Sequence, residues 1–124
     1  MRVNIDTNAC LRFLLDDIPE QAAQTEQKIV AGVAYLTPEV LAECAFVLEK
    51  VYELSRSEIA NGLNALVEVM TCDSEDVYRR AIKVFEEEEK LDMVDSMLIA
   101  RKVVSGDDLP TFDKDMLKAL RRVL

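Results

Sequence analysis

Four carboxylates occupy positions from which they could form one reaction centre. Asp6 and Asp113 each follow a short apolar segment that predicts a strand. Because ligands collect at the carboxyl ends of parallel strands, these two acids are expected at the same edge of a sheet. Glu43 and Asp95 each border the apolar stripe of a predicted helix, where an unpaired charge costs free energy. We therefore predict that all four side chains converge.

Converging carboxylates favour metal chemistry. Two like charges about 4 Å apart repel by roughly 1 kcal/mol in water and by about 4 kcal/mol at an effective dielectric constant of about 20. A hard divalent cation reverses this repulsion, and oxygen-only ligands suit Mg²⁺ or Mn²⁺. Such an ion can hold a phosphodiester, generate hydroxide from bound water and stabilise the leaving oxygen. The chain has no histidine, so catalysis by a histidine base is excluded.

Each acid also has a purely structural explanation. Asp113 could cap the helix that follows it, and Glu43 could pair with a nearby lysine or arginine. Any one of the four positions could be explained in this way. Two acids at strand ends together with two beside apolar helix faces are not explained by capping alone, so a metal site is the stronger hypothesis.

The size and composition of the chain fit one small domain. Half of the 124 residues are apolar, so we expect a single domain over residues 1–124 with a substantial core. No apolar run reaches the length of a membrane span and no signal peptide is recognisable, which favours a cytoplasmic protein that does not associate with membranes. Cys10, Cys44 and Cys72 lie in apolar patterns without C-x-x-C spacing, so buried thiols are expected rather than a zinc site.

The net charge of −9 bears on the expected partners. A protein that binds phosphate backbones usually has a basic surface. Here the basic residues gather from Arg101 onward, whereas Glu86–Glu89 form a dense acidic run. We therefore expect weak unaided binding of nucleic acid, and the acidity suits a basic protein partner. Arg12, about one helical turn beyond Asp6, is the basic side chain that we most expect to contact a substrate.

Short strands alternate with helices along the chain. Strands are expected over residues 2–6, 33–37 and 109–112, with a very short one at 71–72. Thr37 and Pro38 predict a helix start, and Ser55 and Glu58 have the spacing of a capping box. The pattern indicates an α/β fold that is helix-rich, with a short parallel sheet flanked by helices on both faces. The predicted helices span residues 8–16, 20–31, 38–53, 55–70, 74–90, 91–104 and 113–123.

Four segments resemble, in order, the signature blocks of the PIN domain, and in particular those of VapC-type toxins from toxin–antitoxin pairs. The resemblance covers nearly the whole chain, and the ordered set of blocks is specific although no single block is. It implies a parallel sheet wrapped by helices and a divalent-metal-dependent endoribonuclease that hydrolyses RNA. The blocks are Ile5-Asp6-Thr7-Asn8, Pro38-Glu39-Val40-Leu41-Ala42-Glu43, Leu91-Asp92-Met93-Val94-Asp95 and Thr111-Phe112-Asp113-Lys114-Asp115.

The resemblance also assigns roles to residues. It implies that Asp6, Glu43, Asp95 and Asp113 are the catalytic acids and the ligands of Mg²⁺ or Mn²⁺. It further implies a homodimer that is blocked by a small basic antitoxin protein, often through an arginine that reaches into the site. The supporting side chains that would assist the metal ligands or orient water are Thr7, Asp92, Thr111 and Asp115.

Three other readings compete with a nuclease. A receiver domain would have a pair of acids after the first strand, whereas this chain has Asp6 alone. A dehalogenase-type phosphotransferase would have a second aspartate two positions later, where Asn8 stands. The third alternative is a non-catalytic PIN-like interaction module or inactive toxin homologue, and the presence of acids in all four blocks argues against it.

Overall fold

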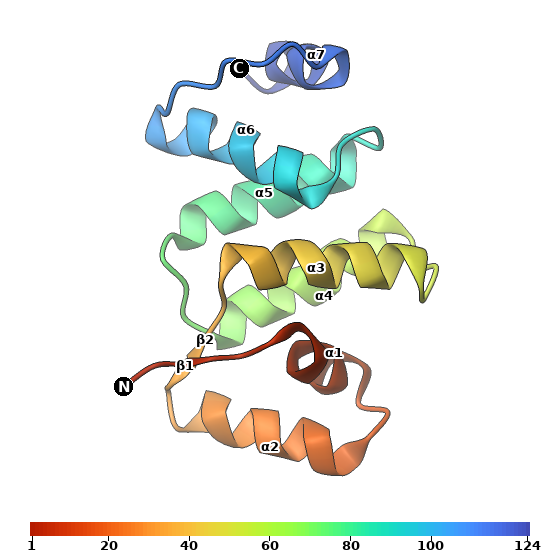
Figure 1. Cartoon of the computed structure of the whole chain (residues 1–124), viewed down its shortest axis with the longest axis vertical. Coiled ribbons are helices and arrows are strands. Elements are labelled where there is room, and N and C mark those ends of the chain that lie inside the picture. Colours follow the sequence, from red (N-terminus) through yellow and green to blue (C-terminus); the bar gives the residue numbers. More distant parts are fainter.

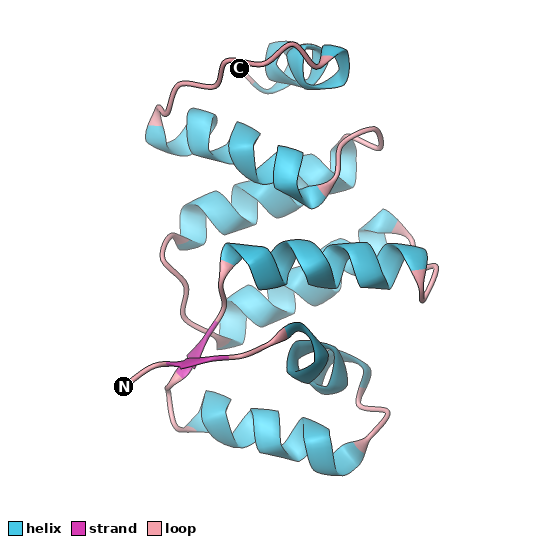
Figure 2. Ribbon diagram, in the orientation of Figure 1, coloured by secondary structure: helices cyan, strands magenta, loops and turns pink.

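The structure, a computed structural model that describes residues 1–124, consists mainly of helices (Figure 1, Figure 2). No helix combines the length and the apolar character that crossing a membrane requires. The helix-rich α/β architecture with a short parallel sheet is confirmed. In chain order the elements are β1 (Val3–Asn4), α1 (Thr7–Leu15), α2 (Pro19–Val30), β2 (Ala34–Tyr35), α3 (Pro38–Lys50), α4 (Arg56–Val69), α5 (Glu75–Glu87), α6 (Met93–Ser105) and α7 (Lys114–Val123).

The sheet is much smaller than the sequence pattern predicts. β1 and β2 pair in parallel, with Val3 opposite Ala34. Tyr35 forms an isolated parallel bridge to Thr71, which corresponds to the very short strand expected there. Figure 2 shows the two strands crossing between helices rather than forming a broad central layer.

The strand predicted over residues 109–112 is wrong, because this segment is a loop. Pro110 has no N–H to donate to a neighbouring strand. The N–H of Leu109 donates to the carboxylate of the adjacent Asp108 at 3.0 Å. Phe112 is fully exposed, so its apolar ring finds no surface to pack against. Asp113 therefore follows a loop and does not lie at the end of a strand.

The helices are arranged in tiers along the long axis of the molecule (Figure 1). α1 and α2 pack together at one end, α3 and α4 form the next tier, and α5 packs most extensively against α6. A main core of 23 buried residues runs from α1 through α3, α4 and α5 to the inner face of α6. A separate cluster of six buried residues attaches α7 to α5 and α6 at the far end.

Local signals in the sequence set several helix ends. Thr37 accepts a hydrogen bond from the N–H of Val40, and Pro38 occupies the first turn of α3. The capping box of α4 is confirmed, since Ser55 and Glu58 each accept from the other's backbone N–H at 3.1 and 3.0 Å. α6 ends at Gly106, which has a φ of 76° and so occupies the left-handed region that favours glycine.

Candidate functional site

Three of the singled-out acids cap helices. The Oδ1 atom of Asp6 accepts from the N–H of Ala9 at 2.9 Å at the start of α1. Asp92 does the same for Asp95 at 2.8 Å at the start of α6, and Asp113 for Met116 at 2.9 Å at the start of α7. Each carboxylate uses one oxygen for its cap and keeps the other for a further ligand. The capping explanation is thus correct for these three acids, without excluding a second role.

The charges of Asp92 and Asp113 act on the carboxyl of Asp95. Asp95 is half-buried in the first turn of α6, whereas Asp92 and Asp113 are exposed. Burial raises the pKa of the Asp95 carboxyl, and the negative charges of Asp92 and Asp113 raise it further. Asp113 of the fourth sequence block is therefore near enough to Asp95 of the third for its charge to act on that carboxyl.

The charges of Asp6 and Glu43 both act on the same buried thiol. Cys10 and Cys44 are fully buried, as predicted, and Cys72 is partly buried. A hydrogen bond with Cys10 and burial are the main causes that raise the pKa of the Cys44 thiol. The charges of Glu43 and Asp6 also raise this pKa, so both acids lie near the contact between α1 and α3. Asp6 and Glu43 thus both lie near enough to Cys44, and Asp113 near enough to Asp95, for their charges to act there.

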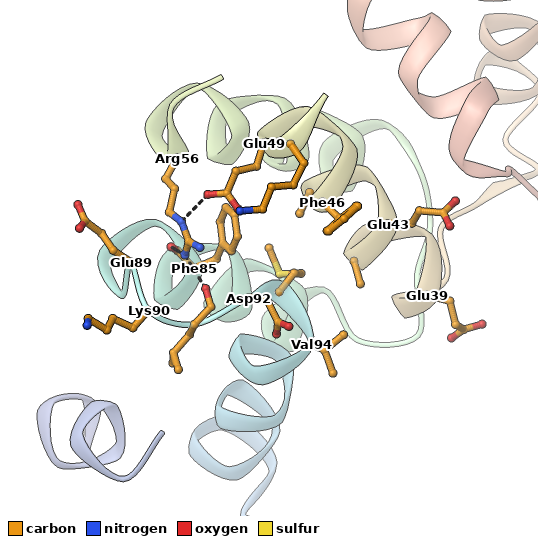
Figure 3. A pocket seen from close by; sticks show the side chains of 15 residues that line it. Glu39, Glu43, Phe46, Glu49, Arg56, Phe85, Glu89, Lys90, Asp92 and Val94 are labelled. Carbon is orange, nitrogen blue, oxygen red and sulfur yellow. Dashed lines mark hydrogen bonds and ion pairs between the residues drawn. The ribbon is translucent and has the colours of Figure 1, made fainter. Parts of the chain in front are cut away.

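A groove of about 740 Å³ separates α3 from the turn between α5 and α6, and residues from two sequence blocks line it. Glu43 belongs to one side and Asp92 to the other. In Figure 3 the carboxylates of Glu39 and Glu43 point away from that of Asp92. A smaller apolar hollow of about 210 Å³ between α3 and α6 continues the groove. The residues that line the groove are Glu39, Ala42, Glu43, Ala45, Phe46, Glu49, Lys50, Arg56, Phe85, Glu89, Lys90, Leu91, Asp92, Met93 and Val94.

The donor chemistry fits a hard divalent cation, but the acids are not gathered into one metal-binding group. Carboxylate oxygens are the ligands that Mg²⁺ and Mn²⁺ prefer, and the pKa of Asp95 is raised first by burial and then by a repulsion that a cation would relieve. No three Asp, Glu or Cys side chains are placed so that they could hold an ion together. Asp6 also borders a separate hollow, which lies beside β1, α1 and α2. The convergence of all four acids on one ion therefore stays a prediction.

The predicted supporting residues differ in their surroundings. The hydroxyl of Thr111 accepts from the N–H of Asp113 at 3.1 Å and so helps to fix the turn before α7. Asp115 is half-buried in the first turn of α7, and Thr7 is half-buried as the first residue of α1. Thr7 makes no side-chain hydrogen bond, so its hydroxyl is available to orient a neighbouring group.

Arg12 is held by other protein groups. Its Nη1 atom donates to Asp17 at 2.8 Å and its Nη2 atom to the hydroxyl of Tyr52 at 3.0 Å. The side chain is only 11% exposed, and its buried Nε atom has no partner. Contact between Arg12 and a substrate stays a prediction, since it would have to involve a side chain that is already engaged.

Sequence reasoning did not identify Phe46 or Arg56, which line the groove beside Glu43 and Asp92. Phe46 could have been found, because Glu39, Glu43 and Phe46 recur at helical spacing and form a face that is not part of the apolar stripe of α3. Arg56 carries no such signal. It simply follows the capping residue of α4, and only the folded chain shows what its guanidinium contacts.

The comparisons with known proteins agree with this architecture. The family model described as the PIN domain matches residues 3–122, which is nearly the whole chain. No curated protein and no solved structure matches the chain. The matched segment includes all four acids and both halves of the groove. The chain therefore belongs to the PIN domain family, whose fold is generally that of metal-dependent nucleases.

Proposed function

We propose that this protein is a divalent-metal-dependent endoribonuclease in which Asp6, Glu43, Asp95 and Asp113 hold Mg²⁺ or Mn²⁺. The observation that carries the proposal is the half-buried Asp95 carboxyl, whose pKa is raised by burial and by the charges of Asp92 and Asp113. A carboxyl placed against two others without a cation is electrostatically unfavourable, and perturbed carboxyls of this kind concentrate at functional sites. Membership of the PIN domain family supports the same conclusion.

The helix caps contribute to the proposed site by limiting the freedom of its side chains. The caps at Asp6, Asp92 and Asp113 fix one oxygen of each carboxylate against a backbone N–H. Each cap also places a carboxylate at the positive end of a helix dipole. A bound divalent ion would supply hydroxide from water and stabilise the leaving oxygen. Because no three acids are grouped around a common point, we propose that cation binding draws the four acids together.

The groove supports a second part of the proposal, which concerns the partner. Its rim is acidic at Glu39, Glu43 and Glu89, and Phe46 and Val94 expose apolar surface in it. With a net charge of −9, such a groove fits a segment that is both basic and apolar. We propose that this partner is a small basic antitoxin, that the protein is the toxin of such a pair, and that it acts as a homodimer.

A specific observation favours the alternative of a non-catalytic interaction module. The caps alone account for the presence of Asp6, Asp92 and Asp113, and the acids do not form a single metal-binding group. The caps do not account for Asp95 or Glu43. Asp95 accepts no hydrogen bond from a cation, and Glu43 pairs with no lysine or arginine, so these two acids separate the two hypotheses.

The experiment measures RNA cleavage and metal binding by the purified protein without a partner. We expect cleavage with Mn²⁺ or Mg²⁺, loss of cleavage in EDTA, and loss in the variants Asp95→Asn and Glu43→Gln. Glu26→Gln on the exposed side of α2 removes the same charge outside the site and should leave cleavage unchanged. The proposal fails if no RNA is cleaved with either metal and calorimetry detects no binding of Mn²⁺.

A further inference from the structure

The structure assigns to Arg56 the role of a positioning residue, which sets the places of Asp92 and Asp95 by holding the turn between α5 and α6. The inference rests on the proposed function in one respect, because it predicts weaker metal binding when Arg56 is replaced. Its structural part concerns contacts within the protein and is tested separately below.

The guanidinium of Arg56 is surrounded by acceptors from one short stretch of chain. Its Nη1 atom lies 2.8 Å from the carbonyl oxygen of Phe85, 3.0 Å from that of Glu88 and 2.6 Å from that of Leu91. Its Nε atom donates to Glu49 of α3 at 3.0 Å. The group also stacks on the ring of Phe85, 4.0 Å from its centre, and the side chain is 16% exposed. Figure 3 shows the guanidinium between α3 and this turn.

The contact with Phe85 satisfies a carbonyl that the end of a helix leaves without a partner, whereas the carbonyl of Glu88 also accepts from the N–H of Leu91. α5 ends at Glu87, and the last carbonyls of a helix have no intrahelical donor. They also carry the partial negative charge of the helix end, which a cation stabilises. The planar guanidinium of Arg56 supplies several N–H groups in a fixed arrangement, which the single ammonium of a lysine cannot reproduce. Arg56 therefore acts as the C-terminal cap of α5 from another helix.

The position of the turn determines where Asp92 and Asp95 lie. Leu91, whose carbonyl Arg56 binds, directly precedes Asp92. Asp92 then accepts from the N–H of Asp95 at 2.8 Å, and its own carbonyl accepts from the hydroxyl of Ser96 at 2.8 Å. A displaced Leu91 would therefore shift the first turn of α6 together with both carboxylates. Because Glu49 lies on α3 with Glu43, the same arginine also couples the turn to the opposite side of the groove.

Charge alone predicts the opposite result, which makes the inference testable. Arg56 is a cation beside an acidic groove, so removing it should strengthen the attraction of the groove for Mn²⁺ if only its charge matters. If Arg56 positions Asp92 and Asp95, removing it should weaken metal binding. Loss of a group that orients metal ligands typically lowers metal affinity by about 10- to 100-fold.

The experiment compares Arg56→Gln and Arg56→Lys with the matched control Arg79→Gln. Arg79 joins α4 and α5 through Glu68 and Glu75, so its replacement removes the same charge without touching the turn. Calorimetric titration with Mn²⁺ should show affinity at least about tenfold weaker for both Arg56 variants and no weakening for the control. Arg56→Lys keeps the charge and is the milder change, so it provides the test if Arg56→Gln does not fold.

Hydrogen exchange of the metal-free proteins tests the structural part. The amides of Asp95 and Ser96 should exchange faster in the Arg56 variants than in the control, while those of α1 stay protected. Unchanged exchange at these amides, or Mn²⁺ binding as tight as in the unmodified protein, would overturn the inference. If the unmodified protein binds no Mn²⁺, the proposed function fails, and the exchange rates alone decide whether Arg56 positions the turn.

Discussion

Asp113 is the residue for which the structural and the proposed catalytic roles can be separated by experiment. Its Oδ1 atom caps α7 by accepting from the N–H of Met116, and its charge contributes to the raised pKa of Asp95. The variant Asp113→Asn keeps an oxygen for the cap and removes the charge. The variant Asp113→Ala removes both. Comparing the two therefore separates the cap from the carboxylate.

The expected cost of losing the cap follows from the structure. Asparagine and aspartate cap helices about equally well, whereas replacement by alanine costs about 1 kcal/mol. In a chain of this length, that change lowers the melting temperature by about 3 to 5 °C. For Asp113→Asn, a weaker interaction with the helix dipole opposes the relief of repulsion with Asp95, so we expect stability within about 0.5 kcal/mol of the unmodified protein. The loss in Asp113→Ala should be concentrated in α7, whose buried contacts with the rest of the molecule lie in the six-residue cluster.

Three measurements test this reasoning. Thermal unfolding followed by circular dichroism should rank Asp113→Asn near the unmodified protein and Asp113→Ala below both. Hydrogen exchange should show faster exchange in α7 for the alanine variant. RNA cleavage should fall at least about 100-fold in both variants, as expected when a group that stabilises the transition state is removed. Equal destabilisation of the two variants would refute the capping argument, and full cleavage by Asp113→Asn would refute the proposed role of the carboxylate.

Three further predictions concern stability. The folded state raises the pKa of Asp95, so without metal this group stabilises the protein below the ordinary carboxyl pKa, and the contribution is lost as pH rises through the raised value. In thermal melts from about pH 3 to 7, Asp95→Asn should weaken this pH dependence and be at least as stable as the unmodified protein at neutral pH. A variant that is less stable at neutral pH would contradict the prediction. Ser55→Ala breaks the capping box and should cost about 1 kcal/mol in denaturant unfolding while leaving metal binding unchanged. Arg122 lowers the pKa of Glu88 by hydrogen bonding, so their pair stabilises the protein above the ordinary carboxyl pKa and this is lost as pH falls through the lowered value. Since Arg122 is more than half exposed, Arg122→Gln should lower the melting temperature only slightly at neutral pH and not at all in acid, and a loss that persists in acid would point to packing instead.

The helices could be predicted from the sequence because their signals are local. The capping box at Ser55, the proline-containing start of α3 and the glycine after α6 each act over a few residues, and the structure confirms them. The predicted ends differ from the observed ones by a few residues, as for α3, which ends at Lys50 rather than at residue 53. Such differences are expected where the last turn of a helix is not fixed by a capping residue.

The sheet could be predicted only in part because a strand requires a partner. The segments around Val3 and Ala34 pair as expected, and Thr71 adds one bridge. The segment at 109–112 has a similar short apolar pattern but finds no neighbour, and Pro110 removes one of its donors. A pattern over four residues indicates an extended chain, whereas pairing depends on whether another strand lies beside it.

For the candidate site, the sequence by itself determined which groups are available: oxygen ligands, no histidine, and acids placed at the starts of helices or beside apolar faces. Only the tertiary structure decided how these groups are distributed. It let the charge of Asp113 act on the half-buried Asp95, placed Asp6 and Glu43 near the buried Cys44, and did not gather the acids into a single metal-binding group. It also gave Arg56 its contacts, although nothing in the sequence around Arg56 indicates them. The physical reason is that capping and helical spacing depend on neighbours a few residues apart, whereas charge repulsion and the hydrogen bonds of a buried guanidinium depend on distances between segments that only folding brings together.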